Sequence, residues 1–268
     1  MPKGVMLSHE NICSNLHGLK KIWTNNFDNQ RSLAFLPWSH LYGQVAELHA
    51  LVATGSQLAI VTRDEILECL PIVKPTVILS VPILFNKVYS GVLKRISNAP
   101  PLVQKLFGNA LKVARHVNSS KEMGVNPGIM SELLYKLYDN IVFQKIRMAL
   151  GGRVRFMGSG GAAVSLPVLH FFEDIGIPIC EGYGLTETSP VITTGANNWQ
   201  TRRLGCSGVA LYNVKVRIID PNTMEELPPG EEGEVCCAGP NVMVGYHNNQ
   251  KANDEVTYHV YDHVCIRI

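Results

Sequence analysis

The sequence predicts an α/β fold: a mainly parallel sheet layered with helices, followed by a small antiparallel β subdomain. Short β-rich runs alternate with longer helical patterns as far as Cys180, which is typical of parallel sheets covered on both faces. After Gly205, strand-like runs are joined by a turn rich in Pro, Gly and acidic residues. The 268 residues, 46% of them hydrophobic, suffice for a substantial core. We therefore expect an α/β core at 1–204, a β subdomain at 205–256 and a tail at 257–268.

The elements follow from the periodicity of apolar residues. Expected strands share short apolar runs bounded by turn residues: 31–37, 56–61, 75–82, 153–158, 177–180, 214–220 and 233–239. Expected helices share a repeat of three to four residues: 44–53, 65–72, 84–96, 103–117, 131–150 and 167–175. Near the N-terminus, Ser8 is expected to cap a further helix, with Glu10 in its first turn.

Composition argues against several classes of protein. The net charge is +2 and Lys and Arg are scattered, so no nucleic-acid partner and no polybasic patch are expected. Seven cysteines without C-x-x-C argue against a disulfide framework or a zinc site, and favour reduced thiols in an intracellular protein. No signal peptide and no apolar run of about 20 residues is present. We expect a cytoplasmic protein, either free or peripheral on a membrane surface.

Three polar or glycine-rich loops follow predicted strands. They are Pro37–His40, Gly158–Gly161 and Glu181–Thr188. Ligands of open parallel sheets bind beyond the carboxyl ends of the strands. The three loops therefore predict one crevice at that edge of the sheet.

The loop "GSGGAAVS" at 158–165 admits three interpretations. Its glycines let backbone N–H groups approach a nucleotide. It also fits G-x-G-x-x-A, with Glu181 ending the next strand about 20 residues on, as in a dinucleotide site. Finally, it is compatible with a tight turn that binds nothing.

The segment "EGYGLTETSP" at 181–190 offers a Gly-aromatic-Gly bend followed by hydroxyls and a carboxylate. Glu187 suits Mg²⁺, which takes oxygen ligands. Thr186 and Thr188 suit phosphate, and Tyr183 suits a base. The alternative is a solvated loop whose threonines bond their own backbone. Outside it, Lys3 is either a phosphate-steering group or a solvated charge, and His40 either lines a pocket or is structural.

Together these segments resemble one family. "PKGVMLSHEN", "FLPWSHLYG", "GSGGAAVS", "EGYGLTETSP" and "GEVCCAGPNVMVGYHNN" occur in the order typical of adenylate-forming, AMP-binding enzymes. The helical insert and "VPILFNKVYSGV" are similar to long-chain fatty-acid–CoA ligases within that superfamily. The resemblance implies a two-step reaction using ATP, Mg²⁺ and CoA: a fatty acid becomes acyl-AMP, then acyl-CoA.

The resemblance also implies roles, residue by residue. Catalytic roles fall to Thr186, which contacts phosphate, to Glu187, which holds Mg²⁺, and to His40, between the acyl and CoA channels. The nucleotide-binding residues that it implies are Lys3, Gly4, Gly160, Gly161, Ala162, Glu181, Gly182, Tyr183, Gly184, Leu185 and Thr186. Under this interpretation Glu181 belongs to the adenylate loop. An NAD-type oxidoreductase is then the less favoured function.

The chain departs from the family pattern at both ends. The Ser/Thr/Gly half of the phosphate loop, the ribose-binding Asp motif and the C-terminal domain with its lysine are not in this sequence, and 257–268 match nothing. We therefore expect a fragment of a longer enzyme, with little or no ligase activity of its own. The alternative is a non-catalytic nucleotide- or acyl-binding remnant.

Overall fold

The computed structural model describes residues 3–23, 29–196, 198–199, 202–260 and 263–267. Its centre is a five-stranded sheet in the order β4–β5–β6–β7–β8. The members of this sheet are β4 (Val77–Ser80), β5 (Phe156–Ser159), β6 (Ile179–Gly184), β7 (Val191–Thr194) and β8 (Val209–Ala210). The first three strands run parallel, and β7 and β8 continue antiparallel. The predicted α/β class is confirmed.

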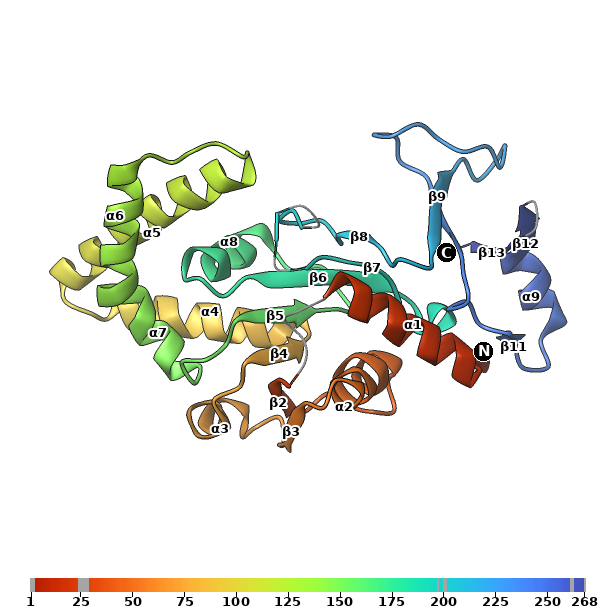
Figure 1. Cartoon of the computed structure of the whole chain (residues 1–268), viewed down its shortest axis with the longest axis horizontal. Helices are drawn as coiled ribbons and strands as arrows, with labels where there is room; N and C mark the ends of the chain where they lie inside the picture. Colours follow the sequence, from red (N-terminus) through yellow and green to blue (C-terminus); the bar gives the residue numbers. More distant parts are fainter. Residues whose placement is uncertain (1–2, 24–28, 197, 200–201, 261–262, 268) are drawn as a thin grey trace.

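Helices cover both faces of this sheet (Figure 1). The helical elements are α1 (His9–Ile22), the π-helix η1 (Gly43–His49), α2 (Ala50–Ala53), α3 (Ile66–Val73), α4 (Pro82–Ser97), α5 (Pro101–Glu122), α6 (Ile129–Tyr138), the π-helix η2 (Asp139–Phe143), α7 (Gln144–Ala149), α8 (Leu166–Asp174), the 3₁₀ turn η3 (Thr186–Thr188) and α9 (Gln250–Val256). Residues of β4 and β5 are buried throughout, as expected of strands with helices on either side. The largest core cluster packs α3, α4, α5 and α8 against them, around Phe85, Phe143 and Phe172.

Smaller sheets flank the central one. Strands β2 (Arg31–Ala34) and β3 (Gln57–Ile60) pair in parallel. Strands β1 (Val5–Met6) and β11 (Gly245–Tyr246) join positions near the two ends of the chain. The antiparallel sheet has the order β12–β13–β10–β9, built from β9 (Lys215–Ile219), β10 (Glu234–Ala238), β12 (Thr257–Val260) and β13 (His263–Arg267). The second sheet predicted after Gly205 is thus present, although β8 still belongs to the central sheet.

Local expectations were met at most elements. Ser8 caps α1, accepting a hydrogen bond from the Asn11 amide, while the Asn11 side chain bonds back to the Ser8 amide. The prediction of a bend at Gly182–Gly184 is wrong. These residues extend β6, which pairs with β7 through a register shift after Tyr183. A Cβ on Gly184 would overlap the Pro190 carbonyl oxygen, so only glycine lets the two strands approach there.

The expected helix at 131–150 is divided by η2. Within the predicted tail, residues 257–260 form β12 and residues 263–267 form β13, which pairs with β10. Across the described part of the chain, no helix is long and apolar enough to cross a membrane.

Candidate nucleotide and acyl site

The parallel strands end in register at one edge of the central sheet. Ser80 of β4 lies beside Ser159 of β5, and Ser159 lies beside Glu181 of β6. The loops that follow β5 and β6 therefore start side by side. The β2–η1 loop joins them, because His40 and Tyr42 lie against the same cavity as the glycines after β5.

This first cavity has a volume of about 250 Å³ and is walled by all three loops. Its walls include eight of the residues singled out from the sequence: His40, Gly160, Gly161, Gly182, Tyr183, Gly184, Leu185 and Thr186. Tyr183 and Thr186 are exposed, so the ring face and the hydroxyl are accessible to a ligand. Gly161 has φ +82°, a conformation that glycine adopts without strain and that shapes the β5–α8 turn.

Ser159 supplies an unsatisfied hydroxyl at the cavity wall. Its side chain is buried, and its Oγ has no hydrogen-bond partner among the described residues. A buried hydroxyl without a partner is costly, whereas a polar ligand in the cavity would satisfy it. The wall chemistry therefore suits a ligand rich in hydrogen-bonding groups, such as a nucleotide.

The loop between β6 and β7 is held by hydrogen bonds within the loop and by hydrogen bonds from Asn15 of α1. The Thr188 hydroxyl donates to the Pro190 carbonyl at 2.6 Å and accepts from the Leu185 amide at 3.0 Å. The Asn15 side-chain amide donates to the Thr188 and Val191 carbonyls at 3.3 and 2.7 Å. Thr188 is fully buried, so the interpretation of its hydroxyl as a phosphate ligand is wrong. It holds the loop that presents Thr186.

Asparagine side chains from both ends of the chain complete this anchoring. Asn241 donates to the Thr188 carbonyl at 3.0 Å. Asn11 donates to the Pro240 and Val242 carbonyls, both at 2.8 Å. The Thr188 carbonyl thus accepts hydrogen bonds from both Asn15 and Asn241, which a carbonyl oxygen with two lone pairs allows.

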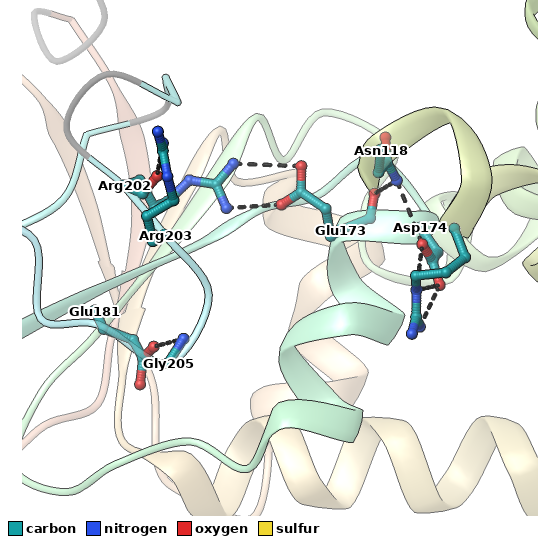
Figure 2. Close-up of polar contacts among 8 residues, drawn as sticks. Asn118, Glu173, Asp174, Glu181, Arg202, Arg203 and Gly205 are labelled. Atoms are coloured by element: carbon teal, nitrogen blue, oxygen red, sulfur yellow. Dashed lines mark hydrogen bonds and ion pairs between the residues drawn. The ribbon is translucent and has the colours of Figure 1, made fainter. Parts of the chain in front are cut away.

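Glu181 does not face the first cavity. One carboxylate oxygen accepts from the Val164 amide and the other from the Gly205 amide, both at 3.2 Å. Figure 2 shows the contact with Gly205. Burial raises its pKa, and the two N–H donors oppose that shift. Glu181 was predicted to wall the AMP site with Gly182–Leu185, but it is not among the residues that line the first cavity; its carboxylate joins the β5–α8 loop to the segment at 205. Because both oxygens already accept a backbone N–H, Glu181 is a poorer candidate for the ribose ligand of a dinucleotide.

The segment at 202–205 is itself anchored to α8. Arg202 forms an ion pair with Glu173 at 2.8 Å, and both side chains are largely buried. Next to it, Arg115 makes a bidentate contact with the fully buried Asp174, with a shortest distance of 2.7 Å. Figure 2 shows the Arg202–Glu173 pair and, next to Glu173, Asp174 at the end of α8. The two ion pairs fix the backbone to which Glu181 is bonded.

Glu187, Tyr246 and Lys3 form a second group beyond Thr186. The Tyr246 hydroxyl donates to one Glu187 oxygen at 2.8 Å, and the Lys3 ammonium lies 4.7 Å from the centre of the Tyr246 ring. Burial and the Glu187 carboxylate raise the pKa of Tyr246 to about 12, so it stays a neutral donor. Lys3, Gly4 and Glu187 do not line the first cavity. The β1–β11 pairing brings Lys3 and Gly4 to this place, with the His247 amide donating to the Gly4 carbonyl.

The Glu187 carboxylate is suited to bind a hard cation as the only protein side chain in its coordination shell. It is half-buried and offers a carboxylate oxygen besides the one bonded to Tyr246. Within the described ranges, no group of three or more His, Cys, Asp or Glu side chains is placed to hold a metal. A single protein carboxylate fits Mg²⁺ that is bound together with phosphate, because Mg²⁺ often keeps water and takes phosphate oxygens as its other ligands.

A second cavity, of about 500 Å³, opens on the other side of His40. It is walled mainly by apolar side chains from the loop after β2 and from α3 and α4, including Phe35, Leu67 and Leu84. Ala162 lines this cavity and not the first. Three residues line both cavities: His40, Tyr42 and Gly161.

The loop that separates the cavities rests on a buried carboxylate. Glu47 of η1 accepts from the Phe35 amide at 3.2 Å and from the Trp38 indole at 3.1 Å. Its side chain is fully buried, and this burial raises its pKa to about 7. His40 is exposed at the end of this loop, with Nδ1 facing the Tyr42 amide at 3.3 Å.

Three residues of this region were not predicted from the sequence: Tyr42, Ser159 and Tyr246. All three lie inside the quoted motifs, so their position next to predicted residues was the available signal. Glu47 carries no such signal, because a Glu inside a helical pattern is normally a solvated residue.

Comparisons with known proteins agree with this geometry. Residues 1–247 match the family described as AMP-binding enzyme. The chain is 31% identical over 262 residues to the peroxisomal long chain acyl-CoA synthetase 7 of Arabidopsis thaliana, covering 95% of this chain and 35% of that protein. It is 33% identical over 264 residues to the long-chain-fatty-acid–CoA ligase 5 of Mus musculus, covering 95% and 36%.

The fold is similar to that of solved adenylate-forming enzymes. ATP-bound MatB from Rhodopseudomonas palustris superposes with a TM-score of 0.66 at 24% identity, covering 98% of this chain and 42% of that one. The chain spans about a third of the length of the curated relatives that it matches. Since the family match takes in most of the sequence and every loop of the site, the chain belongs to the AMP-binding enzyme family.

Proposed function

We propose that this chain forms the nucleotide- and acyl-binding part of a long-chain fatty-acid–CoA ligase. The observation that carries the proposal is the meeting of the two cavities at His40, Tyr42 and Gly161. One cavity has glycines and hydroxyls, and the other is apolar. A carboxylate at the end of an acyl chain in the second cavity would meet a phosphate in the first. The relatives named as long-chain ligases support the same substrate class.

The reaction suits this arrangement. A fatty-acid carboxylate oxygen attacks the α-phosphorus of ATP, and the bond to pyrophosphate breaks, giving acyl-AMP. Positioning the two reactants in line accounts for a large share of such a rate enhancement. In the proposal, Gly160, Gly161 and Tyr183 contact adenine, while the hydroxyls of Ser159 and Thr186 donate to phosphate oxygens. When bound, Mg²⁺ offsets negative charge on the phosphates, and Glu187 is its protein ligand.

The second step transfers the acyl group to CoA. The thiol sulfur attacks the acyl carbonyl carbon, and AMP leaves. His40 is exposed at the junction of the two cavities, where it can contact the acyl carbonyl without rearrangement of the sheet. The proposed context is fatty-acid metabolism at a cytoplasmic or membrane-peripheral location.

Titration calorimetry with AMP and with a non-hydrolysable palmitoyl-adenylate analogue tests the proposal. We expect both to bind, and Ser159→Ala to weaken AMP binding without lowering stability, since it removes a hydroxyl that lacks a partner. A parallel assay with ATP, Mg²⁺, palmitate and CoA measures turnover by the chain. Binding without turnover supports a non-catalytic binding module. Failure of both ligands to bind would overturn the proposal, as would NADH binding in their place.

The neighbouring threonines allow a matched comparison. Thr188→Val removes a buried hydroxyl with two close partners, so we expect it to lower the free energy of unfolding by about 1–3 kcal/mol. Thr186→Val alters an exposed hydroxyl on the cavity wall, so stability should stay within about 0.5 kcal/mol. AMP affinity should fall in Thr186→Val. Urea denaturation and calorimetry separate the two effects, and equal stability losses would contradict the assignment.

A further inference from the structure

The helical unit α6–η2–α7 presents its apolar side chains outward. In α6, none of the ten residues is buried. The exposed large apolar residues of this unit form a stripe along it: Ile129, Met130, Leu133, Leu134, Leu137, Ile141 and Met148. Their exposed fractions range from 38% to 78%. Soluble helices normally direct such residues to the core.

The inward side of the same unit is aromatic and ionic. Tyr135 and Tyr138 are half-buried against the main core. Asp139 and Arg147 form a bidentate ion pair at 2.5 and 2.7 Å. The unit therefore directs its apolar stripe outward, whereas a helix packed on a core normally buries its apolar stripe. An exposed apolar patch of this kind marks an interaction surface.

The charge of this region is equally uneven. Residues 82–150 contain ten of the chain's 24 Lys and Arg but only three of its 22 Asp and Glu, so they carry +7 and the remainder carries −5. Eight of the ten basic side chains are exposed: Lys87, Lys94, Arg95, Lys105, Lys112, Lys121, Lys136 and Lys145. None of these eight forms an ion pair within the described parts of the chain. The other two, Arg115 and Arg147, are paired.

The stripe leads into an apolar groove with a basic rim. A groove of about 690 Å³ lies between α4, α5 and α7. Ile141 belongs both to the stripe and to the groove wall, and Lys87, Arg95 and Lys145 lie at the groove. Figure 1 shows α5, α6 and α7 at the end of the molecule opposite the marked termini. Apolar and cationic groups thus occupy one continuous surface.

We propose that this surface, α6–η2–α7 with the basic residues around it, docks on an anionic lipid bilayer. Apolar side chains flanked by Lys and Arg match the boundary between acyl chains and anionic headgroups. A second copy of the chain would bring two surfaces of the same positive charge together. The inference deepens the proposed function, because it assigns the membrane-peripheral location to one surface and to anionic lipid. The side chains of α6–η2–α7 lie outside both cavities, so vesicle binding and AMP binding can fail separately.

Co-sedimentation of the whole chain with vesicles tests the proposal. We expect binding to phosphatidylcholine mixed with phosphatidylserine, weaker binding to phosphatidylcholine alone, and loss of binding as salt rises. The double variant Leu133→Ser/Leu137→Ser should weaken binding about tenfold, and Lys136→Gln/Lys145→Gln by a similar factor. Val52→Ser/Ile60→Ser changes two exposed apolar residues of α2 and β3 and serves as the matched control, with binding unchanged.

Circular dichroism of each variant checks that the fold is retained, as exposed positions allow. Equal binding to neutral and anionic vesicles would overturn the proposal, and so would full binding by the Leu133/Leu137 variant. Absence of binding by the unaltered chain would do the same. Sedimentation velocity without lipid adds a last outcome: a dimer abolished by Leu133→Ser/Leu137→Ser would assign the surface to a second copy.

Discussion

Arg202→Met is expected to lower the free energy of unfolding by about 3–5 kcal/mol. Arg202 is 3% exposed, and its guanidinium bonds both oxygens of Glu173. Methionine has a similar length but no charge, so the variant leaves a carboxylate largely buried without its partner. The cost of an unpaired buried charge exceeds the value of the pair itself. Urea denaturation monitored by tryptophan fluorescence measures the change.

Two further variants make this expectation specific. Arg217→Met breaks an ion pair with Glu226 that is 3.4 Å long and exposed on both sides, so it should cost less than about 1 kcal/mol. Arg202→Met combined with Glu173→Leu removes both charges and should recover much of the loss. If Arg202→Met and Arg217→Met have equal effects, the buried pair does not anchor the segment at 202–205.

Glu47 should make the stability of the protein fall as pH rises from about 4.5 to about 7. Its ordinary pKa is 4.5, and burial raises the folded-state pKa to about 7. Between these values the folded protein keeps a proton that the unfolded chain releases. The contribution is therefore complete below the unfolded pKa and lost above the folded one. A shift of this size corresponds to about 3 kcal/mol.

Glu47→Gln removes this dependence, because an amide does not titrate in that range. Relative to the unaltered chain, the variant should gain about 3 kcal/mol between pH 5 and pH 8, measured by urea denaturation at both pH values. Glu68→Gln, at an exposed position of α3, is the control and should show no comparable change. A constant difference between Glu47→Gln and the unaltered chain at both pH values would show that the carboxylate is charged throughout.

The sequence was most informative where local rules and burial agree. The strands β2 to β5 and the cap at Ser8 follow from periodicity and side-chain chemistry, and the structure has them close to the expected residues. The glycines of β6 were misleading. Their pattern favours a bend, whereas pairing with β7 across Gly184 fixes an extended strand. Such pairing is a tertiary effect that local preference does not contain.

The candidate site shows the same division. The motifs located the loops, but not which side chains face the ligand. Thr186 and Thr188 are two positions apart and chemically identical, yet one is exposed and the other fully buried. The partners of the Glu181 carboxylate could not be predicted for a similar reason, since its amide donors come from residues 164 and 205. The basic surface was missed because its Lys and Arg are spaced along 82–150 without forming a run, although the charge of that segment is visible in the sequence.

The asparagine anchors of the β6–β7 loop have a consequence for how the site assembles. Asn11 contacts the carbonyls of Pro240 and Val242 across 229 and 231 positions of the chain, and Asn15 reaches the loop across 173. Contacts of such long range require large chain closures and form late in folding. The segment that presents Thr186 is therefore held by Asn15 across 173 and 176 positions of the chain. An ordered β6–β7 loop therefore indicates that distant parts of the chain have come together.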